Sequence, residues 1–187
     1  MDHNDHVNLL RPADIKPGGS WADLGAGSGA FTFATRELSG PTASIYAVDK
    51  DHASLNELEQ DYRARFGDSQ NLYLITGDFT HTLDTSTGSV QRLPALDGIV
   101  MANSLHFLKD KEKILRQVHS YLKPNGILLI VEYNVDSGNP WVPYPFSFET
   151  YRKLAPRAGF TEPRLLATIP SRFLREFYSA VAYKKEK

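Results

Sequence analysis

Cysteine is missing from the 187-residue sequence, so disulfides, cysteine-based zinc sites and thiol nucleophiles are excluded within it. Net charge is nearly absent as well. The 21 basic and 22 acidic residues give a formal charge of −1, which predicts no electrostatic footprint for nucleic acid or an anionic membrane. The start MDHNDHVNLL lacks the basic region and apolar run of a signal peptide, and no segment approaches the length of a membrane span. We therefore expect a cytoplasmic protein with no membrane or nucleic-acid partner.

Short apolar segments alternate with stretches of helical periodicity, which is typical of an α/β protein with a mostly parallel sheet. The expected strands span residues 20–24, 43–49, 71–78, 96–102 and 126–133. The expected helices span residues 28–38, 51–66, 110–122 and 148–158. Two further strand-like runs, 163–170 and 176–184, are joined by a short link and should pair antiparallel. One domain over residues 1–187, built on a seven-stranded sheet, is predicted.

Two segments fit neither kind of element. Residues 79–95 are rich in threonine, serine and glycine, and residues 134–147 carry three prolines among aromatic residues. Proline removes a backbone donor and fixes φ, so the second segment cannot form a regular helix or a central strand. Both segments are predicted to be loops.

The stretch WADLGAGSGAF, residues 21–31, joins the first strand to the first helix. A strand, a glycine-rich turn and a helix N-terminus are typical of a nucleotide site, because glycine permits close approach and the helix offers free N–H groups. Gly25, Gly27 and Ala30 also fit the pattern of NAD-binding proteins. However, a carboxylate at Asp23 would repel a pyrophosphate. It would attract S-adenosylmethionine (SAM), which has no phosphate and carries a sulfonium and an ammonium group.

The run from Asp23 to Gly29 resembles motif I of the class I SAM-dependent methyltransferases. Three later landmarks are similar to that family: AVDKD after the second strand, TGDF after the third and MANSLHFL after the fourth. The segment LKPNGILLIVEY resembles the family's helix stop and fifth strand. An acid such as Asp49 at a strand end accepts hydrogen bonds from ribose hydroxyls, but NAD enzymes place one there too.

The resemblance implies a Rossmann-like three-layer sandwich whose last strand is antiparallel. It also implies SAM as cofactor and S-adenosylhomocysteine as product. The cofactor-binding residues it implies are Asp23, Gly25, Ala26, Gly27, Gly29, Asp49, Lys50, Asp78, Phe79 and Asn103. The function that follows is methyl transfer to a small molecule, by a monomer or a homodimer. An NAD(P)-dependent oxidoreductase and a non-catalytic SAM-binding module are the alternatives.

Residues expected on the acceptor side follow the fourth and fifth strands, because ligands of open α/β sheets lie beyond the strand carboxyl ends. His106 is either a general base or a partly buried histidine that caps the next helix. Expected acceptor contacts are Trp141, Tyr144, Phe146 and Arg172. The alternative is that the rings pack the loop onto the following helix and that the arginine is an ordinary exposed one.

Residues 1–19 are expected to form a short lid or arm over the site. His3 and His6 have the spacing of one helix face, which is compatible with a metal site. A solvated or frayed terminus is the simpler interpretation, and we expect no metal.

Overall fold

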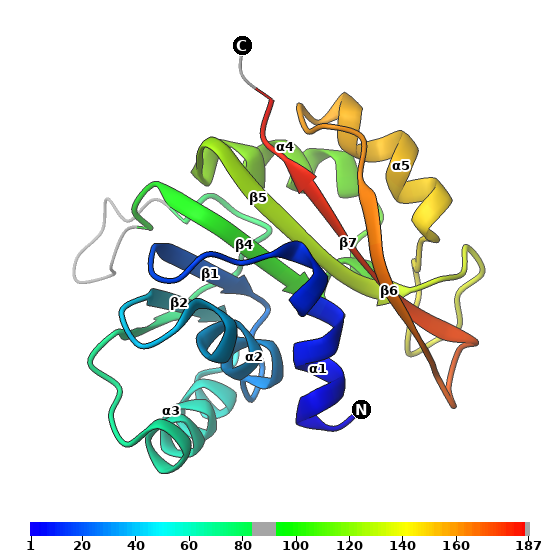
Figure 1. Ribbon diagram of the computed structural model, residues 1–187. Coiled ribbons are helices and arrows are strands. Elements are labelled where there is room, and N and C mark those ends of the chain that lie inside the picture. The colour runs from blue at the N-terminus through cyan, green and yellow to red at the C-terminus, as the bar shows by residue number, and fades with distance from the viewer. Residues whose placement is uncertain (84–92, 186–187) are drawn as a thin grey trace.

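A computed structural model of the chain describes residues 1–83 and 93–185 (Figure 1). Its sheet has seven strands in the order β3-β2-β1-β4-β5-β7-β6. The strands are β1 (Ser20–Leu24), β2 (Ser44–Asp49), β3 (Leu72–Thr76), β4 (Leu96–Ala102), β5 (Leu122–Tyr133), β6 (Arg164–Pro170) and β7 (Glu176–Tyr183). The helices are α1 (His3–Leu10), α2 (Ala30–Ser39), α3 (His52–Phe66), α4 (Lys111–Tyr121) and α5 (Phe148–Arg157), with short 3₁₀ turns at Arg11–Ala13 and Leu105–Phe107.

The first five strands run parallel, and β7 lies antiparallel between β5 and β6. The short turn between β6 and β7 enforces their antiparallel pairing, as the sequence predicts. The predicted α/β sheet with an antiparallel last strand is confirmed. Because β1 and β4 are neighbours while the chain leaves in opposite directions from them, a crevice opens beyond their carboxyl ends.

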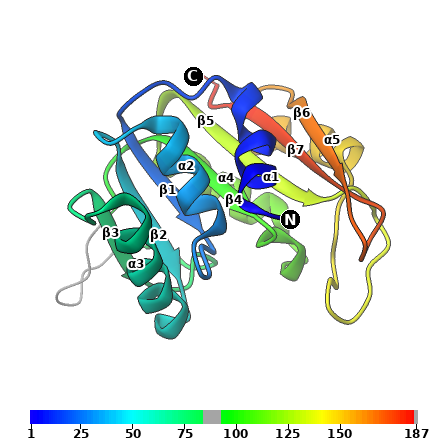
Figure 2. The ribbon, with the colours of Figure 1, turned by 60° about the horizontal axis from the view of Figure 1, so that its bottom comes forward.

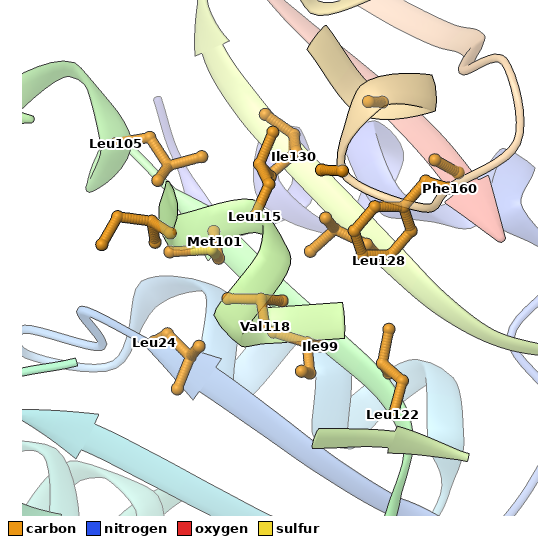
Figure 3. Close-up of a cluster of buried hydrophobic side chains, with 14 of the residues drawn as sticks. Leu24, Ile99, Met101, Leu105, Leu115, Val118, Leu122, Leu128, Ile130 and Phe160 are labelled. Atoms are coloured by element: carbon orange, nitrogen blue, oxygen red, sulfur yellow. The ribbon is translucent and has the colours of Figure 1, made fainter. Parts of the chain in front are cut away.

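Helices cover both faces of the sheet, α1 to α3 on one and α4 and α5 on the other (Figures 1 and 2). The larger core lies under α4 and α5. There Leu115 and Val118 of α4 pack on Ile99, Met101 and Leu128 of the central strands (Figure 3). These strands read as continuous apolar runs because both faces are buried.

The predicted boundary between the fourth helix and fifth strand is wrong. We expected a helix to residue 122 and a strand from 126, but β5 already begins at Leu122, which pairs with Leu96. The register then shifts to Gly98 against Ile127, so the intervening residues form an irregularity in the strand. Asn125 lies there with a positive φ of 60°.

The N-terminal segment is not a solvated or frayed end. It forms α1, which begins with a capping box between Asp2 and Asp5. Val7, Leu9 and Leu10 of this helix are buried with residues of α2 and the sheet. In the described ranges, no helix combines the length and apolar character that crossing a bilayer requires.

Candidate active site

A crevice lies at the carboxyl ends of β1 to β4 and consists of two adjoining cavities. The smaller, of about 240 Å³, is lined by His6, Asp23, Gly25, Ala26, Gly27, Ser28, Ala30, Phe31, Ala102 and Asn103. The larger, of about 510 Å³, is lined by Gly25, Asp49, Lys50, Gly77, Asp78, Phe79, Thr80, Asn103, Ser104, Phe107 and Leu108. Gly25 and Asn103 belong to both walls, so the cavities form one continuous crevice. Nine of the ten residues predicted to bind the cofactor line it; Gly29, at the start of α2, does not.

The glycine loop is held by its own backbone. The N–H groups of Gly25 and Ala26 donate to the Val48 carbonyl, at 2.8 and 3.0 Å. The Gly27 N–H donates to Oδ2 of Asp49 at 2.9 Å, and the Gly29 N–H donates to the Ala26 carbonyl. A pyrophosphate site needs free amides, and these four already have protein acceptors. The loop is therefore a poor cradle for a dinucleotide.

Gly25 is required by geometry. Its φ of +84° is unfavourable for residues with a side chain. A Cβ atom there would lie 2.7 Å from Cβ of Ser104, on the opposite wall of the crevice. The chain segments after β1 and β4 can approach this closely only around a glycine.

Asp23 lies at the end of the smaller cavity and is only 2 % exposed. One of its oxygens accepts a hydrogen bond of 2.7 Å from the Thr32 hydroxyl. Burial raises the pKa of Asp23 to about 7, and the nearby Asp49 adds to this while Thr32 opposes it. A buried carboxylate has lost its favourable interactions with water. A cationic ligand would replace them, so Asp23 is suited to bind a cationic group.

The acids after β2 and β3 face the larger cavity. Asp49 accepts from the N–H groups of Gly27 and Asp51, at 2.9 Å each, which fixes its carboxylate while leaving further lone pairs. Hydrogen bonds from Thr80 lower the pKa of Asp78, so this residue is an ionised acceptor. The ring of Phe79 forms an apolar wall beside Gly25.

Two polar side chains in the crevice wall have no partner in the part of the chain that the structure describes. They are Oδ1 of Asn103 and Oγ of Ser104, both buried. Asn103 also has a φ of +53°, which is uncommon for a residue other than glycine. Buried polar atoms are normally hydrogen-bonded, so these groups are suited to receive a polar ligand. Sequence analysis identified Asn103 but not Ser104, although the two are adjacent.

His106 is not among the residues that line the two cavities, although Ser104 and Phe107 beside it line the larger one, and it is 3 % exposed. Its Nδ1 is 2.7 Å from Oε2 of Glu132, a fully buried residue of β5. The other oxygen of Glu132 accepts from the backbone N–H groups of Leu105 and His106. The sequence did not identify Glu132 as a functional residue. Its signal was a lone acid among the apolar residues of an expected buried strand.

The four predicted acceptor contacts do not come together. Trp141 is 72 % exposed and meets Phe173 edge to face, with ring centroids 6.3 Å apart. Tyr144 is half-exposed, and its N–H donates to the His106 carbonyl. Phe146 is instead a core residue that packs on Tyr151 and Tyr178, so the structure contradicts its predicted role as a pocket wall. Arg172 is exposed in the turn between β6 and β7.

The histidines of α1 do not form a metal pair. Nε2 of His3 bonds to Glu37 at 2.7 Å, whereas His6 packs on Phe31 with ring centroids 4.8 Å apart. No group of three potential metal ligands occurs among residues 1–83 and 93–185. A larger cavity of about 580 Å³ exists at the amino end of β1, beside Trp21 and Asp97, but it is remote from the strand ends at which ligands bind in such sheets.

Comparison with known proteins agrees with this geometry. Residues 15–156 match the model of a family described as a methyltransferase domain. An arsenite methyltransferase from Aquipseudomonas alcaligenes is 26 % identical over 178 residues, which are 87 % of this chain and 49 % of that protein. The ubiquinone/menaquinone biosynthesis C-methyltransferase UbiE of Burkholderia mallei is 25 % identical over 80 % of this chain and 56 % of its own length. The chain thus spans about half the length of these curated relatives.

Solved structures share the fold. The YcgJ protein from Bacillus subtilis superposes with a TM-score of 0.77 at 12 % identity, over 100 % of both chains. The arsenic(III) S-adenosylmethionine methyltransferase of Chlamydomonas reinhardtii gives a TM-score of 0.70 at 22 % identity, over 91 % of this chain and 64 % of that one.

This chain belongs to the methyltransferase-domain family, and its fold is that of the class I SAM-dependent methyltransferases. The predicted class is confirmed, and SAM is the cofactor of that class. The crevice fits it: the buried carboxyl of Asp23 suits a cationic group, and the unpartnered Asn103 and Ser104 suit a polar one.

Proposed function

We propose that the chain transfers a methyl group from SAM to a small, planar and largely apolar acceptor. The observation that carries the proposal is the buried Asp23 carboxyl, which has no cationic partner among the residues that line the smaller cavity, beside a glycine loop whose Gly25, Ala26, Gly27 and Gly29 amides already have protein acceptors. The proposed cofactor contacts are Asp23 with its loop at the methionine end, Asp49 and Lys50 at the ribose, and Asp78 and Phe79 at the adenine. One domain, a cytoplasmic location and a monomeric or homodimeric state are further parts of the proposal.

When bound, SAM supplies an electrophilic methyl group on a sulfur atom that leaves as a neutral thioether. The acceptor atom forms a bond to the methyl carbon, the carbon–sulfur bond breaks toward sulfur, and the acceptor loses its proton. The protein mainly has to position the acceptor and exclude water. A base is needed only where the acceptor proton is not easily lost.

The His106–Glu132 pair is the proposed proton acceptor. Two backbone N–H groups donate to one oxygen of the Glu132 carboxyl, and Nδ1 of His106 lies 2.7 Å from the other; in the proposed arrangement Glu132 accepts from all three. Nδ1 of His106 then carries the hydrogen that it donates to Glu132, and Nε2 is left as the proton acceptor. Glu132 acts as a positioning residue that fixes the ring and its tautomer, as carboxylates do in hydrolase triads.

A row of aromatic rings supports the choice of a planar acceptor. Phe173 lies between the exposed Trp141 and Tyr133, with centroid distances of 6.3 and 6.1 Å. The Tyr133 ring is in turn 5.9 Å from that of His106. The row reaches the crevice through Phe107, which lines the larger cavity and whose ring centroid is 4.2 Å from that of His106. Exposed aromatic side chains in such a row are suited to bind an apolar ring.

An organic acceptor also suits the composition better than a metalloid. The arsenite relative acts on a soft element, and soft elements favour thiolate ligands. This sequence has no cysteine to provide one.

Calorimetry with SAM and NAD tests cofactor binding, and release of S-adenosylhomocysteine in the presence of a panel of small phenols and quinols tests transfer. We expect SAM binding, no NAD binding and turnover with a subset of the panel. SAM binding with no turnover on any acceptor would favour the non-catalytic module, and binding of NAD alone would overturn the proposal.

Substitutions separate the base from its surroundings. We expect His106→Gln and Glu132→Gln to lower kcat by roughly 10²- to 10⁴-fold while SAM affinity stays within a few-fold. His106→Gln should also abolish the acid limb of the pH profile, whereas Glu132→Gln keeps the imidazole and should keep that limb. His52→Gln is the matched control, because His52 is exposed at the start of α3 and its Nδ1 meets the Thr76 hydroxyl rather than a carboxylate. An unchanged pH profile in the His106 variant would assign that residue a structural role.

A further inference from the structure

The methionine end of SAM carries a carboxylate as well as an ammonium group, so the smaller cavity must accommodate a negative charge. Among the residues that line it there is no lysine or arginine, and the only carboxyl, Asp23, would repel an anion. The carboxylate of SAM therefore needs another hydrogen-bond donor in the wall of this cavity.

The backbone offers little. In other nucleotide sites the loop amides bind the anion, but here those of Gly25, Ala26, Gly27 and Gly29 donate to protein acceptors. Ser28 and Asn103 also line the wall, but they offer only uncharged donors to a carboxylate.

His6 is the one titratable side chain in that wall that can donate a hydrogen bond or carry positive charge. It is half-buried, and its ring packs on Phe31 at the start of α2. The helix that bears it is fixed, because Val7, Leu9 and Leu10 are buried in the core and His3 is bonded to Glu37. The ring is thus placed over the cavity by tertiary packing rather than by the glycine motif.

We propose that His6 binds the carboxylate of the amino-acid end of the methyl donor, which makes α1 part of the cofactor site. This inference rests on the proposed function. Burial lowers the pKa of His6 in the free protein, so the ring gains from an anionic partner in the same way that Asp23 gains from a cationic one. Asp23 would bind the ammonium group at the amino-acid end of SAM, and His6 would bind the carboxylate.

Calorimetry with SAM and with decarboxylated SAM tests the proposal, since the second ligand keeps the adenosine, sulfonium and ammonium groups and lacks only the carboxylate. We expect the wild-type protein to prefer SAM by about 10- to 100-fold, the effect of one charge-assisted hydrogen bond. His6→Phe keeps a ring against Phe31 but has no nitrogen. We expect it to bind both ligands with nearly equal affinity, and to bind decarboxylated SAM as the wild type does.

His3→Ala is the matched control on the same helix, and we expect it to retain the wild-type preference for SAM. The inference is overturned if His6→Phe also retains that preference, if His3→Ala loses it, or if the wild type shows none. Thermal unfolding of each variant without ligand establishes that it is folded. A wild-type protein that binds neither ligand contradicts the proposed function itself, which is a different outcome.

Discussion

The two sides of the crevice are built differently. On the cofactor side, Asp23, Asp49 and the glycine loop lie at the ends of buried parallel strands and are fixed by backbone hydrogen bonds. On the proposed acceptor side, Trp141 and Phe173 are exposed side chains that line neither cavity and are carried by a proline-containing loop and a turn. A site fixed by a sheet retains its geometry through large changes elsewhere in the sequence, whereas loops can change the acceptor at little cost to the fold.

The largest effect should come from closing the space between the crevice walls. We expect Gly25→Ala to abolish SAM binding, a loss of more than about 100-fold by calorimetry, because its Cβ would meet Ser104 at 2.7 Å. Gly67→Ala is the control, since Gly67 has the same φ of +84° but no atom within 4 Å of the added Cβ. Both variants should lose about 1–2 kcal/mol of stability from backbone strain, and Gly25→Ala should lose more because of its contact with Ser104. Equal SAM affinity in both would show that the crevice wall is not rigid.

Removing the charge of Asp23 should weaken SAM binding by roughly 10- to 100-fold and yet stabilise the free protein. The folded pKa is about 7 and the unfolded one about 3.8, so ionisation of Asp23 destabilises the fold as pH rises across that interval. Asp23→Asn should therefore raise the melting temperature at pH 8, by an amount corresponding to about 4 kcal/mol, and have little effect near pH 4. An equal change in melting temperature at pH 4 and pH 8 would mean that ionisation of the Asp23 carboxyl is not the cause of the stabilisation.

On the acceptor side, Trp141→Ala should raise the KM for a planar acceptor about 5- to 10-fold and leave SAM affinity and melting temperature unchanged. The reason is that the side chain is exposed and contributes little to the core. Leu165→Ala is the control, because Leu165 is also exposed and apolar but lies on β6. This substitution should alter none of these quantities. A fall in SAM affinity with Trp141→Ala would mean that the two sides of the crevice are not independent.

The smallest effect is expected at the amino-terminal end of the central strand β4, at the end of the strands opposite the crevice. Asp97 accepts from the Ser20 N–H and from Lys123, at 2.8 Å each. Burial alone would raise its pKa, but these hydrogen bonds outweigh it and lower the pKa. Its stabilisation is then present at neutral pH and lost as pH falls through the folded value. Because the pair is partly exposed, Asp97→Asn should cost less than about 1 kcal/mol at pH 7, and nothing in acid, with normal SAM binding.

Local patterns determined most of the sheet and the cofactor side. Asp23, Asp49 and Asp78 each follow a run of apolar residues, and parallel strands bring their carboxyl ends to one edge. The boundary near Leu122 was not predictable because its pairing with Leu96 depends on a distant strand. Phe146 was misplaced because an aromatic residue in a loop gives no sign of whether it faces a ligand or Tyr151 and Tyr178.

The sequence by itself determined the class of this protein, since the order of strand, acid, glycine loop and helix depends on neighbouring residues. Only the tertiary structure decided that Glu132 meets His106 and that His6 lies over the smaller cavity. The first contact joins residues 26 positions apart, and the second joins a residue of α1 to the loop after β1. Their formation depends on how helices and strands pack together rather than on any local periodicity.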